Sequence, residues 1–183
     1  MTLRSLFQRP RPQPQPAELL YLEIVRQARQ PAFYARFGVP DTLDGRFDMI
    51  VLHAVLVLLR LKAEGAVGEA LGQALFDVLF ADMDRSLREM GVGDLGVGKR
   101  VKQMGKAVYG RLAAYDAALT AGETELEAAV ARNLYGTVAP APVHVAAMAR
   151  YIRAGAAQLG AQPVDALAAG RLAFPAPEDP EYR

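Results

Sequence analysis

The sequence predicts an all-α fold, an irregular bundle of six to eight helices with no sheet. Apolar residues recur at helical spacing along most of the chain, no segment has the alternating pattern of a strand, and glycine or proline lies near most predicted helix ends. A chain of 183 residues can bury one sizeable core. We therefore expect a single helical domain over residues 17–172.

Eight helical segments follow one another along this domain. Pro31 and Pro163 start short helices, while Gly38, Gly65 and Gly122 end the helices before them. The predicted segments are 17–29, 32–37, 43–64, 67–90, 97–119, 123–135, 143–159 and 163–170.

The segment 67–90 is apolar on two roughly opposite faces. A helix of this kind packs between neighbours on both sides. We therefore expect it to be the central element of the fold. The first face holds Val67, Leu71, Leu75 and Val78, and the second holds Phe76, Phe80, Met83, Leu87 and Met90.

Both ends of the chain lack helical patterns. Residues 1–16 are basic, free of acidic side chains and rich in proline and glutamine, without the apolar stretch of a secretory signal. Residues 173–183 contain Pro175, Pro177 and Pro180, which oppose regular structure. We expect a disordered tail at each end.

The composition excludes several kinds of site. The chain has no cysteine, which rules out disulfides, zinc–thiolate sites and iron–sulfur clusters. Its net charge of +1 provides no overall attraction for nucleic acid, so no DNA partner is expected. The longest apolar run, residues 49–59, is too short to span a bilayer. The excess of arginine over lysine favours a bacterial source.

The segment 82–111 combines charged residues with a cluster of glycines. Gly91, Gly93 and Gly96 match G-x-G-x-x-G, but a helix is predicted before them where dinucleotide binding requires a strand. A run that begins at Gly93 matches the start of a P-loop, G-x-x-x-x-G-K. Arg100 then stands where serine or threonine would hold magnesium, so nucleotide binding is not expected.

These glycines instead fit a connection between two helices. Gly91 is a candidate left-handed C-cap, and Asp94 is a candidate N-cap. Gly93, Gly96 and Gly98 have no capping role, so we expect the loop to let its backbone approach a partner closely.

A basic stripe follows the glycine loop. Lys99, Lys102 and Lys106 lie within about 60° of each other at 100° per residue, opposite an apolar stripe. With Arg100 and Arg111 on its flanks, this face would suit phosphates, an acidic protein or lipid head groups. The competing interpretation is that it is only the solvated side of the helix.

Adaptable apolar side chains surround the same loop. Methionine fits varied apolar partners, and we predict a cleft edged by Met83, Met90 and Met104 together with Phe80 and Tyr109. The candidate partner-binding residues are Phe80, Met83, Arg88, Met90, Gly91, Gly93, Asp94, Gly96, Gly98, Lys99, Arg100, Lys102, Lys106, Tyr109 and Arg111.

No set of residues forms a convincing active site. His53 lies inside an apolar helix and is predicted to be a hydrogen-bonded core or interface residue rather than a metal ligand. Asp82 and Asp84 are two positions apart and cannot share a helix face. We predict no enzymatic activity, no metal site and no cofactor. A cryptic enzyme that uses these aspartates and the glycine loop on a phosphorylated ligand is the least favoured hypothesis.

Several motifs resemble one known family. They are Tyr34–Asp41, Gly45–Ile50 followed by His53, Leu75–Asp77 and the segment Asp82–Arg111. Together they resemble the ubiquinol–cytochrome c chaperone family over about residues 20–119, with weaker similarity to about residue 170. The resemblance implies a non-enzymatic chaperone for assembly of respiratory complex III, the cytochrome bc1 complex. It further implies action on newly made cytochrome b, with a small partner protein and near the ribosome.

Two functions of different classes follow from these observations. The favoured hypothesis is an assembly chaperone for nascent cytochrome b, which is cytoplasmic in a bacterium with peripheral contact at the inner membrane. In a eukaryote it would act in the mitochondrial matrix or at the inner membrane. The alternative is a ribosome- or RNA-binding helical module that uses the Lys99–Lys106 stripe, with strongly salt-dependent binding. The stripe would meet the ribosome surface or anionic lipid.

Overall fold

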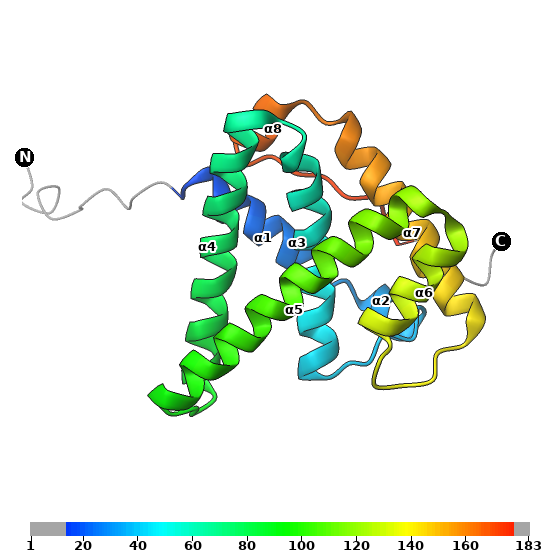
Figure 1. Ribbon diagram of the computed structural model, residues 1–183, viewed down its shortest axis with the longest axis horizontal. Helices are drawn as coiled ribbons and strands as arrows, with labels where there is room; N and C mark the ends of the chain where they lie inside the picture. Colours follow the sequence, from blue (N-terminus) through cyan, green and yellow to red (C-terminus); the bar gives the residue numbers. More distant parts are fainter. Residues whose placement is uncertain (1–13, 178–183) are drawn as a thin grey trace, which may run out of the picture.

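The computed structural model describes residues 14–177, which form eight α-helices and no strand (Figure 1). The helices are α1 (Pro16–Ala28), α2 (Pro31–Ala35), α3 (Leu43–Lys62), α4 (Gly65–Glu89), α5 (Asp94–Ala121), α6 (Glu123–Leu134), α7 (Pro142–Ala161) and α8 (Val164–Ala168). The prediction of an irregular all-α bundle is confirmed. Residues 1–13, most of the predicted N-terminal tail, and residues 178–183 lie outside the described part.

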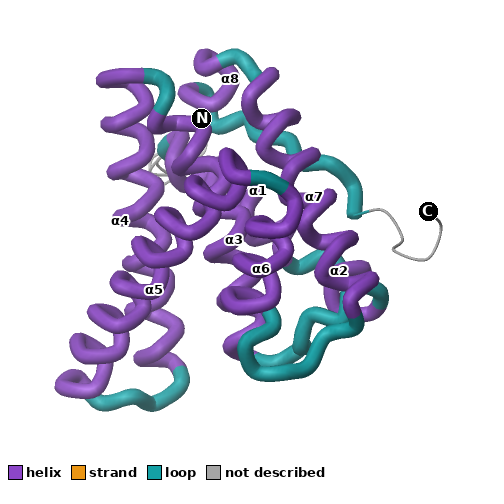
Figure 2. The backbone as a smooth tube through the Cα atoms, turned by 45° about the vertical axis from the view of Figure 1, so that its right-hand side comes forward, coloured by secondary structure: helices purple, strands orange, loops and turns teal. Residues whose placement is uncertain are grey.

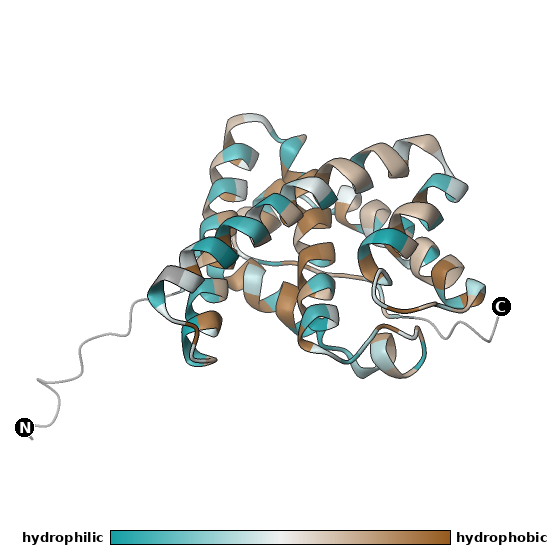
Figure 3. Cartoon of the chain, turned by 60° about the horizontal axis from the view of Figure 1, so that its bottom comes forward, coloured by the Kyte–Doolittle hydropathy of each residue, from teal (hydrophilic) through white to brown (hydrophobic). Residues whose placement is uncertain are grey.

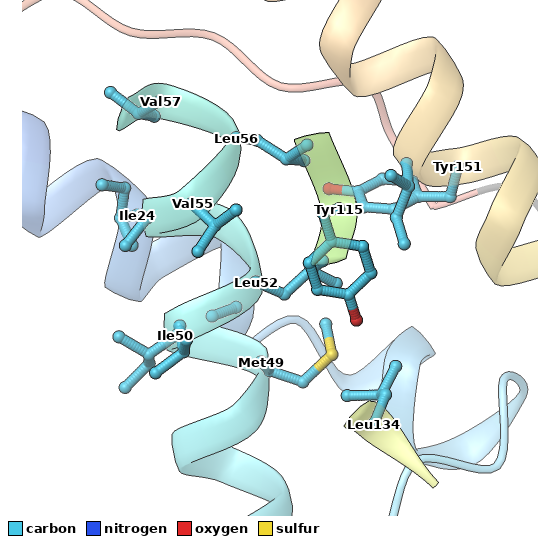
Figure 4. Close-up of a cluster of buried hydrophobic side chains, with 14 of the residues drawn as sticks. Ile24, Met49, Ile50, Leu52, Val55, Leu56, Val57, Tyr115, Leu134 and Tyr151 are labelled. Atoms are coloured by element: carbon cyan, nitrogen blue, oxygen red, sulfur yellow. The ribbon is translucent and has the colours of Figure 1, made fainter. Parts of the chain in front are cut away.

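Helix α3 is the centre of the fold. It contacts α1, α4, α5, α6 and α7, and every residue from Met49 to Val57 is buried. Figure 4 shows side chains such as Ile50, Leu52 and Leu56 pointing from α3 in different directions, toward Ile24 of α1 on one side and the neighbouring helices on the other. The run of apolar residues that is too short for a membrane span is therefore a core helix surrounded by others.

The prediction that segment 67–90 forms the centre is wrong. One face of α4 is buried through Leu75, Leu79, Met83 and Leu87, where the helix packs on α1, α3 and α5. The start of the helix is open, and Val67 is 56% exposed. Periodicity identifies apolar faces correctly, but it does not state how many neighbours cover them.

Helices α4 and α5 are joined by a short loop and diverge from it (Figure 1), and we call the pair the hairpin arm (residues 65–121). Figures 1 and 2 both show the connecting loop at one end of the molecule, apart from α2 and α6. Gly65 and Gly91 have positive φ angles of 58° and 80° at the two ends of α4. Left-handed backbone of this kind favours glycine, and Gly91 lies just after the helix as the sequence predicts.

We call the described part of the chain outside the hairpin arm the body (residues 14–64 and 122–177). The end of the described chain packs onto helices of this body. Gln162 bonds to the backbone nitrogen and oxygen of Ala173, and the ring of Phe174 lies 4.9 Å from that of His53. The side chain of Gln27 donates to the Pro175 carbonyl at 2.9 Å. The expectation of a disordered tail from residue 173 is therefore wrong for 173–177. Prolines exclude a helix there, but they leave carbonyls free to accept hydrogen bonds.

The helices differ in how hydrophobic their residues are. Figure 3 shows α3 as largely hydrophobic, whereas the half of α5 next to the loop is largely hydrophilic. Within residues 14–177, no helix is both long enough and apolar enough to cross a bilayer.

Candidate functional site

A cleft of about 390 Å³ lies between the hairpin arm and the body. Four elements contribute to it, namely α1 with its C-cap, the first half of α3, the last two turns of α4 and the start of α5. Its lining residues are Tyr21, Arg29, Leu43, Asp44, Phe47, Ile50, Asp82, Met83, Ser86, Leu87, Met90, Arg100, Gln103 and Met104. The cleft therefore adjoins the glycine loop that the sequence singles out.

The apolar lining of the cleft comes from two walls. On the arm, Met83, Met90 and Met104 all line it, as the sequence predicts for these methionines. They differ in exposure, since Met83 is buried and Met90 is 49% exposed at the rim. The facing wall consists of Leu43, Phe47 and Ile50 from α3.

Charged groups stand at the rim of the cleft. The carboxylate of Asp82 is already engaged, because it accepts a hydrogen bond from the Tyr21 hydroxyl at 2.7 Å and pairs with Arg85. Burial, and then this hydrogen bond, raise the pKa of Tyr21 well above its usual value. Arg29 and Arg100 form no ion pair with any residue in 14–177. The rim thus offers two available cations above an apolar floor.

The loop beside the cleft differs in detail from the prediction. Gly93, rather than Asp94, is the N-cap of α5, and Asp94 is the first helical residue. Arg88 joins the two helices by pairing with Asp84 at 2.6 Å and with Asp94. Asp94 therefore contributes through this ion pair and through its place at the positive end of the helix dipole.

The four glycines occupy two kinds of position. Gly91 and Gly93 lie in the loop, whereas Gly96 and Gly98 lie in the first turns of α5, so the predicted loop is too long. No side chain or distant backbone lies within 4 Å of a Cβ built at Gly91, Gly93 or Gly98. The molecule itself does not use the close approach that these glycines permit, and the surface is open to a second molecule.

The basic stripe lies on the outer face of α5. Lys99, Lys102 and Lys106 are exposed, and none has an ion pair or hydrogen bond within the described chain. Arg100 follows Lys99 and lies about 100° further around the helix, so it lines the cleft instead.

Arg111 lies away from that stripe. Its guanidinium pairs with Asp48 at 2.6 Å, and both side chains are only 18% exposed. It also approaches the carbonyl of Asn133 at 3.4 Å. Arg111 therefore joins α5 to α3 and α6, and its position leaves little of it for a partner to reach.

Phe80 and Tyr109 do not line the cleft. The ring of Phe80 lies 4.4 Å from that of Phe76, and the Phe76 ring lies 5.1 Å from that of Tyr109. Tyr109 is 60% exposed and, with Phe76, lines a separate groove between α4 and the end of α3. The structure thus splits the predicted apolar cleft into two surfaces on either side of the arm.

His53 lies in the core, as the sequence predicts, with both ring nitrogens engaged. Nδ1 lies 2.7 Å from the Met49 carbonyl, and Nε2 lies 2.8 Å from the Tyr151 hydroxyl. Because a carbonyl only accepts, Nδ1 must carry the proton and Nε2 must accept from Tyr151. The hydroxyl of Tyr151 in turn accepts from Gln27 at 2.9 Å. Burial lowers the pKa of His53 to about 4, which keeps the ring neutral.

The candidate partner-binding residues predicted from the sequence include none of the cleft residues that the body contributes. Leu43, Phe47 and Ile50 follow i, i+4, i+7 spacing, so their shared face was detectable. Tyr21 and Arg29 carry no comparable signal. Which face of α3 meets α4 depends on packing between helices, and the sequence pattern alone does not determine it.

The chain matches a family model described as ubiquinol-cytochrome C chaperone over residues 35–174. The chain belongs to this family. The match includes α3, α4 and α5, and therefore both walls of the cleft apart from the α1 residues.

Known relatives agree with this assignment. The chain is 25% identical to ubiquinol-cytochrome c reductase complex assembly factor 1 of Homo sapiens over 134 residues, which are 73% of this chain and 45% of the human protein. The corresponding factor of Xenopus laevis is 24% identical over 73% of this chain and 67% of that protein. This chain spans less than half the length of the human relative.

A solved structure has the same fold. The crystal structure of the Cbp3 homologue from Brucella abortus superposes with a TM-score of 0.80 at 40% sequence identity. The similarity covers 88% of this chain and 90% of the Brucella chain. Within residues 14–177 there is no cluster of three or more His, Asp or Glu side chains that could hold a metal ion.

Proposed function

We propose that this protein is a non-enzymatic assembly chaperone for the cytochrome bc1 complex, and that its cleft binds an apolar segment of newly made cytochrome b. The observation that carries the proposal is the match to the chaperone family across the helices that form the cleft. The proposal places the protein in the cytoplasm of a bacterium, near the inner membrane where such a client is inserted.

The chemistry of the cleft supports an apolar client. Three methionines on the arm face Leu43 and Phe47 on the body, and methionine adapts to partners of irregular shape. Arg29 and Arg100 at the rim could meet acidic groups or carbonyls at the end of a client helix. An apolar floor with a polar rim is typical of helix-in-groove recognition.

The size of the cleft limits what it holds. A volume of about 390 Å³ falls in the range of about 300–1,000 Å³ found for ligand pockets. A membrane-spanning helix of about 20 residues is far larger. The cleft would therefore take a few side chains from one face of a client helix, and it would not enclose the whole helix.

Site-specific crosslinking tests the position of the client. A photoreactive amino acid at Leu43 or Met90, on opposite walls of the cleft, should crosslink to newly made cytochrome b in the native host. The matched control is Leu22 on α1, which is 60% exposed and lies outside the cleft. Equal crosslinking from Leu22 would show that contact is not localised to the cleft.

Charged substitutions test whether the cleft is needed for assembly. In a deletion strain, the variant Leu43→Asp with Met90→Asp should fail to restore b-type haem absorbance and complex III activity, because it places carboxylates on both apolar walls. Leu22→Asp with Val138→Asp is the control, since both residues are exposed and outside the cleft. Normal cytochrome b in the deletion strain itself would refute the proposed function.

A further inference from the structure

The outer face of α5 carries a charge that the molecule does not neutralise. Between Asp94 and Asp116 the helix contains no acidic residue, while Lys99, Lys102 and Lys106 project from one side. These three lysines have no partner within residues 14–177. Lys62, the fourth lysine of the chain, bonds to Asp116 at 2.9 Å. The outer face of α5 is therefore a row of free ammonium groups.

An exposed aromatic ring lies at one end of this row. Tyr109 is 60% exposed about one turn beyond Lys106, whereas Met90 at the other end of the row lines the cleft. At 100° per residue, Tyr109 lies about 50° from the centre of the lysine row. Figures 1 and 2 show this end of the arm projecting from the molecule. A flat surface could thus touch the lysines and the ring of Tyr109 together.

We propose that the outer face of α5 and the tip of the hairpin arm dock on an anionic phospholipid surface. Lysine side chains beside an exposed tyrosine match the composition of a membrane interface, where charges meet head groups and amphipathic rings lie at their level. Each lysine close to an anionic bilayer strengthens binding roughly fivefold, so three together supply about a hundredfold.

The same features fit RNA less well. Single-stranded nucleic acid is held in a basic groove with aromatic platforms, but the three lysines line neither the cleft nor the groove at Tyr109. The face carries one aromatic ring, Tyr109, rather than a series of stacking platforms. A convex row of point charges suits a flat anionic surface better than a nucleic-acid strand.

Docking on lipid would leave the cleft accessible. The cleft is lined from α5 by Arg100, Gln103 and Met104, which lie roughly 130°, 70° and 170° around the helix from the centre of the lysine row. The lipid surface and the cleft are therefore different sides of one helix. The inference does not depend on what occupies the cleft.

Vesicle flotation tests the proposal on the full chain. The protein should float with vesicles of phosphatidylcholine that contain about one-third phosphatidylglycerol, and should not float with pure phosphatidylcholine or at high ionic strength. The triple variant Lys99→Gln, Lys102→Gln, Lys106→Gln should bind the anionic vesicles about a hundredfold more weakly. Its circular dichroism should be unchanged, because all three side chains are exposed.

The matched control removes the same charge elsewhere. Arg132, Arg150 and Arg171 are exposed and have no side-chain partner within the described chain. The triple variant Arg132→Gln, Arg150→Gln, Arg171→Gln should retain anionic-vesicle binding within a few-fold. An equal loss in the control would mean that net charge alone drives binding, and unchanged binding in the lysine variant would overturn the assignment. Lysine-dependent binding to purified ribosomes or polyuridylate without any to vesicles would identify the face as an RNA surface instead.

Discussion

In the body of the molecule, the hydroxyl of Tyr151 meets both His53 and Gln27, and Gln27 reaches the chain end at Pro175. In the hairpin arm, the side chains of Lys99 and Lys102 form no hydrogen bond or ion pair with a residue in 14–177. Polar side chains thus join helices distant in sequence within the body, and Asp82 and Arg111 do the same between arm and body, whereas the lysine stripe of the arm has no such partner in residues 14–177. This contrast supports the proposals that place partner contacts on the arm.

The largest expected difference in stability is between removal of an aromatic ring from the body and removal of one from the arm. Phe33 is fully buried against the rings of Phe37, His53 and Tyr151, so Phe33→Ala should lower the free energy of unfolding by about 3–5 kcal/mol. Tyr109→Ala in the arm should lower it by less than about 1 kcal/mol, because its ring is mostly exposed. Urea denaturation followed by circular dichroism measures both. Equal losses would contradict the division between body and arm.

Removal of the single hydroxyl group of Tyr151 should have a smaller effect on the free energy of unfolding. Tyr151→Phe keeps the ring but removes the hydrogen bond to His53 Nε2, which is left unpaired in the interior, and one of the two hydrogen bonds that Gln27 Nε2 donates. We expect a loss of about 1–3 kcal/mol in the free energy of unfolding. Tyr109→Phe is the control in the arm, where the hydroxyl has no partner within residues 14–177, and should be neutral. A neutral Tyr151→Phe would show that the buried chain of hydrogen bonds contributes little stability.

The shifted pKa values of His53 and Asp48, both on α3, should have opposite effects on the free energy of unfolding as the pH falls. Burial lowers the pKa of His53 to about 4, so the unfolded chain binds the proton first and stability falls as pH drops from about 6.5 towards 4. Burial, partly offset by Arg111, raises the pKa of Asp48 to about 6. The folded protein then binds that proton first, and stability rises as pH drops through about 6 towards 4.

Single substitutions separate these two contributions. Between about pH 8 and pH 5, His53→Gln should remove about 2 kcal/mol of the acid-induced loss, and Asp48→Asn should deepen that loss by about 1 kcal/mol. The measurement is the free energy of unfolding at each pH for the two variants and the parent. Parallel pH profiles for all three would show that neither group titrates differently on folding.

The smallest effect tests whether the arm's open glycines cost stability. A Cβ at Gly98 would meet no other group within 4 Å, so Gly98→Ala should raise the free energy of unfolding by about 0.5–1 kcal/mol through helix propensity. At Gly45 in the body a Cβ would lie 2.1 Å from the Pro40 carbonyl oxygen. Gly45→Ala should therefore destabilise the protein. Thermal denaturation compares them, and a destabilised Gly98→Ala would show that this glycine is needed for folding.

The fold class was predictable because helical periodicity is a local property. The segment 43–64 was predicted within two residues of α3, and Gly91 was placed correctly after α4. The position of Met83, Met90 and Met104 beside a cleft was also predicted, since all three lie close in sequence to one turn. The central helix of the bundle was not predicted, because a sequence pattern with two apolar faces does not show which face other helices cover more completely.

The sequence by itself determined the helices, the tight turn at Gly91 and the separation of apolar from basic side chains on α5, because each depends on neighbours within a few positions. Tertiary structure alone decided that α3 is central, that Phe47 and Ile50 form the second wall of the cleft, and that Arg111 turns toward Asp48. These contacts join residues far apart in the chain. They are fixed by how helices fill space against one another, which the spacing of residues along one helix does not encode.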